Sequence, residues 1–217
     1  MEKTALIIID MENGFINKES AQCIKMAAST VNTCARVAEY ARKNRIPVFF
    51  VNRIYRSDGS DVEHTRFVGW YNGGKSMSDK CQVNIDYNNP IELTPRDEDY
   101  VIIKPRFSAF FMTELDLILR RLGVENVILA GTTTPNCIRT SCYDAISLDY
   151  NVIIIEDCCS SQTIEIQRAN MYDMKNIGAH IISSEEFLGM EKFDFSNSLG
   201  KCREKVAEER RAYYEKA

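Results

Sequence analysis

Three residues that can take part in covalent chemistry stand directly behind apolar runs of this chain. Asp10 and Lys104 each end such a run, and Cys137 follows the run 126–130 after a short turn. A thiol between a strand and a helix lies near free N–H groups and the positive end of the helix dipole, which can hold a thiolate. A lysine nearby also lowers the thiol pKa, and a carboxylate can take the thiol proton and return it to a leaving amine. The sequence therefore predicts a nucleophilic Cys137 served by Asp10 and Lys104.

The elements that must position these residues alternate between strand and helix. The expected strands are Thr4–Asp10, Val48–Asn52, Tyr100–Lys104, Asn126–Ala130, Val152–Glu156 and Ala179–Ile182, and the expected helices are Ser20–Lys43, Met112–Leu122, Ile138–Leu148 and Thr163–Lys175. Continuous apolar strands that alternate with helices are typical of a parallel sheet covered on both faces. We therefore predict an α/β fold with three α-β-α layers and a doubly wound, Rossmann-like, mainly parallel sheet of six strands. Since such strands share one carboxyl edge, the three reactive residues should meet there.

The predicted domain covers residues 1–190, and a charged helical extension covers residues 191–217. The segment 52–99 shows little periodicity and contains several glycines and prolines, and a loop-rich insert of this length is usually functional. Within it, Tyr71–Lys80 is predicted to form a mobile lid or a subunit contact. The terminal helix is expected to be solvated, with a contact between subunits as the alternative.

Bulk properties exclude several classes of protein. With 45% hydrophobic and 27% charged residues, the 217-residue chain can bury a full core, and its net charge of -4 argues against a nucleic-acid partner. No run approaches the roughly 20 apolar residues that span a bilayer, and the N-terminus does not resemble an export signal. We expect a cytoplasmic protein with no membrane partner and no cofactor. Its eight cysteines should then be free thiols. The adjacent Cys158 and Cys159 are expected to be packed thiols, with a redox role as the minor alternative.

Three ordered stretches resemble the isochorismatase-like cysteine hydrolases, a family that includes nicotinamidases, N-carbamoylsarcosine amidase and ureidoacrylate hydrolases. The stretches are Ala5–Phe15 (ALIIIDMENGF), Lys104–Phe110 (KPRFSAF) and Gly131–Cys137 (GTTTPNC), and the similarity is greatest to a plant and bacterial branch with the pattern TPNCIR. The resemblance implies that Cys137 attacks an amide carbonyl and forms a thioester, with Asp10 as the proton shuttle and Lys104 as the stabiliser of the thiolate.

The same resemblance implies how the backbone near the nucleophile is arranged. The oxyanion hole would consist of the backbone N–H groups of Thr133 and Cys137, and a cis peptide bond would join Thr132 to Thr133. Relatives are commonly dimers or tetramers, so a homo-oligomer is expected.

A metal site is not expected. The nicotinamidases that the chain resembles bind a metal through an Asp-x-His pair and a further histidine. The corresponding region of this sequence has Arg53 and Tyr55 at the expected ligand positions, and His64 stands alone. A single histidine in a polar segment is more often a surface residue than a ligand. We therefore predict no catalytic metal.

Five residues are predicted to contact the substrate. They are Phe15, Arg53, Trp70, Phe107 and Asn136. Arg53 leaves the second strand at the reactive edge, where a guanidinium fork suits a carboxylate or a carbonyl, and a salt bridge to Asp61 or Glu63 is its structural alternative. The aromatic residues would wall the pocket, with plain core packing as their alternative.

These observations favour a cysteine-dependent amidohydrolase that cleaves a small carboxamide or ureido C–N bond. Three alternatives remain. Nicotinamidase-type activity ranks lower because the histidines are missing, and isochorismatase-type cleavage of a vinyl ether requires no nucleophilic thiol. The third is a non-enzymatic interaction module, which the presence of all three reactive residues disfavours.

Overall fold

A single parallel sheet forms the centre of the molecule. The structure, a computed structural model, describes residues 3–78, 87–191 and 199–215. Its strands are β1 (Thr4–Ile9), β2 (Val48–Asn52), β3 (Tyr100–Ile103), β4 (Asn126–Thr132), β5 (Asn151–Ser160) and β6 (His180–Ile182). All six pair in parallel in the order β3-β2-β1-β4-β5-β6. The predicted doubly wound α/β fold is confirmed, and its topological switch point lies between β1 and β4.

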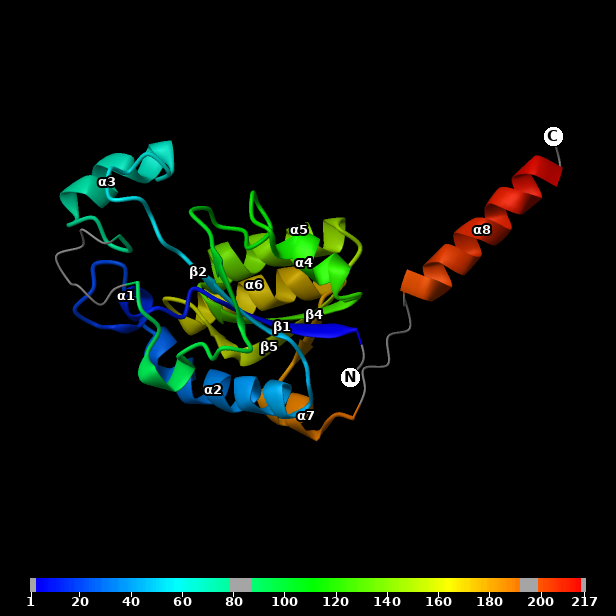
Figure 1. Cartoon of the computed structure of the whole chain (residues 1–217), viewed down its shortest axis with the longest axis horizontal. Coiled ribbons are helices and arrows are strands. Elements are labelled where there is room, and N and C mark those ends of the chain that lie inside the picture. Colours follow the sequence, from blue (N-terminus) through cyan, green and yellow to red (C-terminus); the bar gives the residue numbers. More distant parts are fainter. Residues whose placement is uncertain (1–2, 79–86, 192–198, 216–217) are drawn as a thin grey trace.

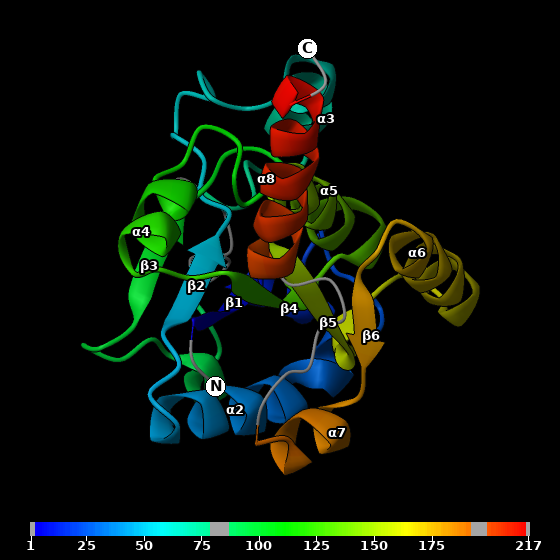
Figure 2. The same cartoon turned by 90° about the vertical axis from the view of Figure 1, so that its right-hand side faces the viewer.

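Helices cover both faces of the sheet. They are α1 (Asn13–Ile16), α2 (Ala27–Lys43), α3 (Phe67–Asn72), α4 (Leu115–Arg121), α5 (Arg139–Ser147), α6 (Ile164–Asn176), α7 (Ser184–Gly189) and α8 (Leu199–Glu215), with the short turns η1 (His64–Arg66), η2 (Ile91–Leu93) and η3 (Thr134–Ile138). Helices α4, α5 and α6 lie over one face, and α2 and α7 lie over the other (Figure 1; Figure 2). No helix in the described ranges is both long and apolar enough to cross a membrane.

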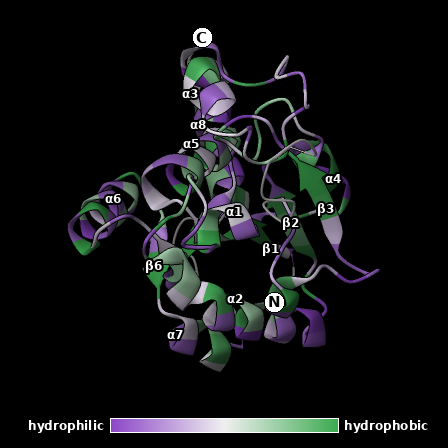
Figure 3. Cartoon of the chain, turned by 90° about the vertical axis from the view of Figure 1, so that its left-hand side faces the viewer, coloured by the Kyte–Doolittle hydropathy of each residue, from purple (hydrophilic) through white to green (hydrophobic). Residues whose placement is uncertain are grey.

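The alternation of side chains along each buried strand builds two cores. Ile7 and Ile9 of β1 pack in the core beneath α4, α5 and α6, whereas Leu6 and Ile8 pack in the core beneath α2 and α7. The strands are mostly hydrophobic, and α2 carries both hydrophobic and hydrophilic residues around its axis (Figure 3). This is the pattern of a sheet that is buried on both faces by amphipathic helices.

Two helices begin later than predicted. Helix α2 starts at Ala27 and not at Ser20, because the Ser20 hydroxyl accepts the N–H of Gln22 and the N–H of Ile24 donates to the carbonyl of Phe15. Helix α4 starts at Leu115 and not at Met112, since Met112 has a left-handed φ of 56°. In both segments the helical spacing of apolar residues continues through the turn that precedes the helix. The spacing therefore predicts a helix that is too long at its N-terminus.

Strand β5 is longer than predicted. It extends through Ser160, with a register irregularity against β4: Leu129 pairs with Ile154, but Gly131 pairs with Cys159. The predicted strand end at Glu156 is therefore wrong, and Cys158 and Cys159 lie within the strand. A bulge next to a functional edge re-aims the side chains that follow it.

The insert 52–99 has a small core of its own. Phe15, Ile24, Tyr55, Trp70 and Met77 pack together, with Ala27 and Val62 completing the cluster. The Trp70 indole N–H donates to the carbonyl of Ser76 at 2.8 Å, and the N–H of Tyr55 donates to the carbonyl of Met77 at 2.7 Å. The predicted lid, Tyr71–Lys80, is thus tied to this core as far as residue 78, and its last two residues lie outside the described ranges.

Helix α8 occupies Leu199–Glu215 of the C-terminal segment, where a charged helix was expected. None of its residues is buried, and it projects away from the sheet and its helices (Figure 1). The boundary placed after residue 190 precedes a segment, 192–198, that lies outside the described residues, so the division into a domain and an extension remains a prediction.

Two backbones approach each other closely at the switch point. Gly131 of β4 pairs with Ile9 of β1 and has a φ of +117°. A Cβ at Gly131 would lie 2.0 Å from the Ile9 carbonyl oxygen, a distance at which no side chain fits. Since Asp10 follows Ile9 directly, this contact brings the end of β1 against the turn that follows β4.

Replacement of Gly131 should therefore destabilise the whole sheet. Gly131→Ala forces the β1 and β4 backbones apart, and we expect the free energy of unfolding to fall by more than about 4 kcal/mol, or folding to fail. Gly178→Ala is the matched control, because Gly178 has a similar φ of +108° but open space around it. It should cost only about 1–2 kcal/mol of backbone strain in urea unfolding. Equal losses in the two variants would show that backbone strain alone, and not the contact with Ile9, sets the cost.

Candidate active site

Three side chains converge at the carboxyl edge of the sheet. Asp10 follows β1 with a left-handed φ of 52°, a conformation that aspartate tolerates better than most residues. Lys104 follows β3, and Cys137 lies in η3 after β4. Asp10 and Lys104 are both 0% exposed and Cys137 is 3% exposed. The expected meeting of the three residues at one edge agrees with this geometry.

A buried ion pair connects the ends of β1 and β3. The Lys104 Nζ lies 2.7 Å from Asp10 Oδ2 and also donates to the carbonyl of Arg106 at 3.0 Å. The Lys104 N–H donates to Asn52 of β2, so the side chain reaches across the end of that strand to Asp10. Removing one partner of such a pair leaves an uncompensated charge in the interior, which is why the two groups constrain each other.

Cys137 lies in a π-helical turn and not at the first turn of an α-helix. The turn η3 spans Thr134–Ile138, and α5 begins only at Arg139, one residue later than predicted. The peptide bond between Thr132 and Thr133 is cis, as the resemblance implies. The Thr134 hydroxyl contacts the carbonyl of Ser160 at 3.0 Å, which ties the turn to β5. The Ser141 hydroxyl donates to the Cys137 carbonyl at 2.6 Å and fixes the nucleophile's backbone from α5.

Burial opposes the charge effects that were expected to activate the thiol. It raises the pKa of Cys137 above the ordinary value, and the negative charge of Asp10 raises it further. The positive charges of Lys104 and Arg53 act in the lowering direction but do not prevail. The expected lowering effect of Lys104 on the thiol pKa is therefore present, but desolvation outweighs it and the net shift is upward. A buried thiol of this kind depends on a nearby base to become a thiolate.

Arg53 lies between the thiol and the acid. Its guanidinium Nη2 is 3.4 Å from the Cys137 Sγ, and its Nε is 3.7 Å from Asp10 Oδ2. The expected alternative, a salt bridge to Glu63, is present at 3.0 Å from Nη1. Asp61, the other acid considered, instead accepts the N–H of Arg56. The side chain of Arg53 is only 2% exposed, so its permanent charge belongs to the interior of the site.

Glu12 is a site residue that the sequence reasoning missed. It is 0% exposed, and its Oε1 accepts the backbone N–H of Arg53 at 2.5 Å. Burial, and then the charge of Asp10, raise the pKa of Glu12 well above its ordinary value. Within the described ranges, Glu12 Oε2 and Asp10 Oδ1 are buried oxygens without a hydrogen-bond partner. The sequence did contain a signal for Glu12, because it is a second acid two residues after Asp10 inside the same motif.

Three of the five residues predicted to contact a substrate line the same cavity, and two do not. Phe15, Arg53 and Trp70 line one narrow, enclosed cavity together with Tyr55 and Met77. Phe15 and Trp70 also belong to the small core of the insert, so the alternative of plain core packing applies to them.

Two more of these residues lie outside that cavity. Phe107 is half-buried, and its ring lies 4.9 Å from the Arg53 guanidinium. Asn136 is exposed on η3 and has no recorded contact with the other four residues. Their roles as substrate contacts remain predictions.

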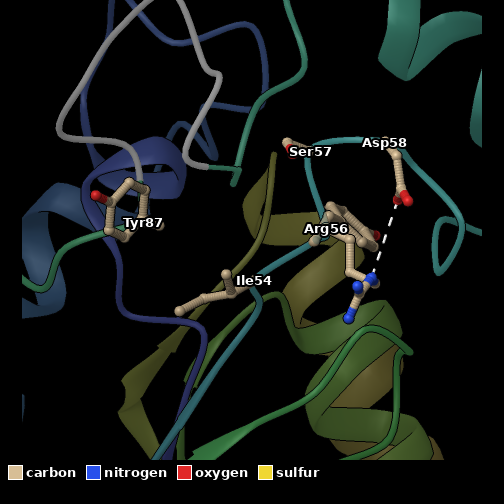
Figure 4. A pocket seen from close by; sticks show the side chains of 6 residues that line it. Ile54, Arg56, Ser57, Asp58 and Tyr87 are labelled. Carbon is tan, nitrogen blue, oxygen red and sulfur yellow. Dashed lines mark ion pairs between the residues drawn. The ribbon is translucent and has the colours of Figure 1, made fainter.

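A more open pocket shares Tyr55 with that cavity. It has a volume of about 390 Å³ and is lined by Ile54, Tyr55, Arg56, Ser57, Asp58 and Tyr87. Figure 4 shows Arg56 and Asp58 facing each other at its rim, with their charged atoms 4.0 Å apart. Cys137 is not among the residues that line this pocket, whereas Tyr55, a partner of Arg53, is.

The residues at the expected metal position do not fit a metal ion. Arg53 and Tyr55 contact each other and Glu63, so a guanidinium charge occupies this part of the site. His64 is exposed, and no cluster of three His, Cys, Asp or Glu suited to a metal occurs among the described residues.

The remaining described cysteines are free thiols, as expected; Cys81 lies outside the described ranges. Cys158 and Cys159 are buried in β5, and the Cys34 thiol donates to the Cys158 carbonyl at 3.3 Å. A hydrogen bond with Cys34, followed by burial, raises the pKa of the Cys158 thiol. Packed, protonated thiols of this kind are unreactive, so the redox alternative gains no support from the geometry.

The raised pKa of Glu12 predicts a stability that depends on pH. Because the folded state holds this proton more tightly than the unfolded chain, the stabilisation is full below the ordinary pKa near 4.5 and is lost as pH rises through the folded pKa. Glu12→Gln keeps an acceptor for Arg53 and removes the titration. In urea unfolding from about pH 5 to about pH 9, the variant should gain stability relative to the native chain as pH rises.

The matched control is Glu92→Gln, which changes an exposed acid. It measures how much pH dependence follows from the loss of a surface acid alone. A difference for Glu12→Gln no steeper than that for Glu92→Gln would mean that the Glu12 pKa is not raised.

Comparison with known proteins agrees with this geometry. The isochorismatase domain model matches residues 4–186. A protein of Arabidopsis thaliana named as a probable inactive nicotinamidase is 41% identical over 176 residues, which cover 81% of this chain and 89% of the relative. A ureidoacrylate amidohydrolase of Acinetobacter baylyi is 27% identical over 218 residues, covering 92% of this chain and 87% of that protein.

A solved structure supports the same assignment. The crystal structure of an isochorismatase family protein from Desulfovibrio vulgaris superposes with a TM-score of 0.81 at 35% identity, covering 85% of this chain and 96% of that one. The family match, the sequence identity and the six-stranded parallel sheet agree with one another. The chain belongs to the isochorismatase-like hydrolase family.

Proposed function

We propose that this chain is a cysteine-dependent amidohydrolase that cleaves a small carboxamide or ureido C–N bond. The observation that carries the proposal is the convergence of Asp10, Lys104 and Cys137 in one buried cluster. The Lys104–Asp10 distance of 2.7 Å and the common contact of Asp10 and Cys137 with Arg53 support it. An acid, a base and a nucleophile held this close can pass a proton without bulk water.

In the acylation half-reaction, Asp10 takes the proton of the Cys137 thiol. The thiolate attacks the substrate carbonyl carbon, and the negative charge passes to the carbonyl oxygen. The backbone N–H groups of Thr133 and Cys137 are the proposed donors to that oxygen. As the C–N bond breaks, the protonated Asp10 returns its proton to the leaving nitrogen, which departs as ammonia or an amine, and a thioester of Cys137 remains.

In the deacylation half-reaction, water replaces the leaving amine. Asp10, ionised again, takes a proton from the water, whose oxygen attacks the thioester carbonyl. Collapse of the tetrahedral intermediate releases the carboxylic acid and the Cys137 thiolate, which recovers its proton from Asp10. Lys104 Nζ lies 2.7 Å from Asp10 Oδ2 and holds the Asp10 carboxyl group in position in both half-reactions.

The ureido or amide class is favoured over the other substrates. The relative in Acinetobacter baylyi is named a ureidoacrylate amidohydrolase, and this chain shares most of its length. Nicotinamidase-type activity is less favoured because a guanidinium occupies the position where a metal was considered. Cleavage of a vinyl ether by acid chemistry gives a nucleophilic thiol no role. The release of pyruvate from isochorismate would overturn this ranking.

A second candidate function is a non-enzymatic binding module. The observation that favours it is the name of the plant relative, a probable inactive nicotinamidase, which is 41% identical. The low exposure of Cys137, 3%, is consistent with a closed site. The buried pair of Lys104 and Asp10 argues against this candidate. Two charges removed from water contribute little net stability, so a purely structural role does not account for them.

The amidohydrolase proposal predicts a specific pattern of activity loss. Against a panel of amides and ureido acids, assayed by ammonia release, the native chain should turn over at least one compound. Cys137→Ser should lower that rate by at least about 10³-fold and abolish the acyl-enzyme mass adduct. Asp10→Asn and Lys104→Met should each lower it by about 10²–10⁴-fold.

The control is Cys202→Ala, which removes an exposed thiol of α8. It should retain the native rate. Full turnover by Cys137→Ser would sink the proposal, whereas no turnover of any compound by the native chain would favour the binding module.

A further inference from the structure

We propose that Arg53 is itself a catalytic residue, the second counter-ion of the Cys137 thiolate, and not a clamp for a substrate carboxylate. The inference rests on the proposed function, in which Cys137 is the nucleophile. It differs from the substrate-contact role that the sequence predicts for Arg53. The argument starts from the partners of the guanidinium group.

Protein groups already occupy the donors of Arg53. Nη1 donates to the Tyr55 hydroxyl at 2.6 Å and to Glu63 Oε1 at 3.0 Å. Nη2 donates to the carbonyl of Arg106 at 3.0 Å and contacts the Cys137 Sγ at 3.4 Å. The remaining donor, Nε, lacks a hydrogen-bond partner among the described residues and lies 3.7 Å from Asp10 Oδ2. A substrate carboxylate would find no free pair of N–H groups.

The surroundings hold this charge in one place. Glu12 accepts the backbone N–H of Arg53, and the Phe107 ring lies 4.9 Å from the guanidinium carbon. A guanidinium stays protonated in proteins, and a buried one with fixed partners needs little reorganisation when a nearby group becomes charged. Arg53 is therefore preorganised to stabilise an anion that forms beside it.

Proton transfer creates that anion within reach of the same group. Before transfer, the negative charge lies on Asp10, 3.7 Å from Arg53 Nε and 2.7 Å from Lys104 Nζ. After transfer, Asp10 is neutral and the charge lies on the sulfur, 3.4 Å from Arg53 Nη2. The net charge of the cluster does not change, and Arg53 is adjacent to both positions of the negative charge. This offsets the burial that otherwise disfavours the thiolate.

Other charged groups act on the thiol or on Arg53. Asp10 disfavours the thiolate, and Lys104 favours it together with Arg53. Glu63, on the far side of the guanidinium, reduces the field of Arg53 at the sulfur. Arg66 shares Tyr55 and Glu63 with Arg53 but has no recorded contact with Cys137. Removal of Arg53 and removal of Glu63 should therefore shift the thiol pKa in opposite directions.

The test measures the thiol without any substrate. The rate of iodoacetamide alkylation of Cys137 is followed against pH by peptide mass spectrometry in the full chain, with Cys137→Ala as the blank. Arg53→Gln should raise the alkylation midpoint by about one pH unit or more, since it removes a cation in contact with the sulfur. Arg53→Lys, which keeps the charge, should give a smaller shift.

Two further variants keep the test decisive. Glu63→Gln removes the anion that compensates Arg53 and should lower the midpoint. Exposure of the buried thiol would lower it too, so this variant is compared only if its thermal unfolding matches that of the native chain. Arg66→Gln removes a half-exposed charge and should leave the midpoint within about 0.3 units. An unchanged midpoint in a folded Arg53→Gln would overturn the proposal. If that variant does not fold, an unchanged midpoint in Glu63→Gln would overturn it.

The result can be separated from the fate of the amidohydrolase proposal. Alkylation reports the thiolate whether or not any amide is turned over, so a shifted midpoint without turnover supports Arg53 while the amidohydrolase proposal fails. The carboxylate-clamp alternative predicts the reverse pattern. Arg53→Gln would then raise KM for carboxylate-bearing substrates alone and leave the alkylation midpoint unchanged.

Discussion

The buried ion pair between Lys104 and Asp10 is the constraint on which the arrangement of the reactive edge depends. Both side chains are fully removed from water, and their charged atoms are 2.7 Å apart. Such a pair is a poor source of net stability, because desolvation of two charges offsets most of their attraction. Its value is geometric, since it joins the end of β3 to the end of β1 across β2. It also presents the acid to a thiol that arrives from β4 on the other side.

The close packing of β1 and β4 supplies the second half of that geometry. Gly131 lets the β4 backbone pass against Ile9, and the turn that follows carries Cys137 to the position where Arg53 can touch it. Burial then determines the chemistry of the resting state. The thiol and Glu12 both favour their neutral forms, while Lys104, Arg53 and Asp10 form a charged network. A proton can move inside this network without a change in its total charge, which limits the solvent reorganisation that the step requires.

The insert 52–99 connects this edge to the surface. Its aromatic residues pack into a small core with Phe15, and Tyr55 lines both the enclosed cavity and the open pocket. The insert therefore carries two of the partners of Arg53, Tyr55 and Glu63, and the residues that line the open pocket. Helix α8 lies outside this arrangement, beyond the residues that match the family model. Its solvated surface agrees with its charged composition.

The amino-acid sequence by itself determined the order of the elements, the parallel sheet and the meeting of Asp10, Lys104 and Cys137 at one edge. These follow from local signals, because apolar runs and helical spacing are properties of neighbouring residues and parallel strands share their carboxyl ends. Helix starts such as Ala27 and Leu115 escaped prediction, since turns at Ser20 and Met112 interrupt a continuous apolar pattern.

Only the tertiary structure decided the partners of Arg53, the burial of Glu12 and the net direction of the Cys137 pKa. Each depends on groups far apart in the chain: Arg53 meets Cys137 across 84 positions, and Lys104 meets Asp10 across 94. Desolvation is likewise a property of everything packed around a group, which no local pattern of residues encodes.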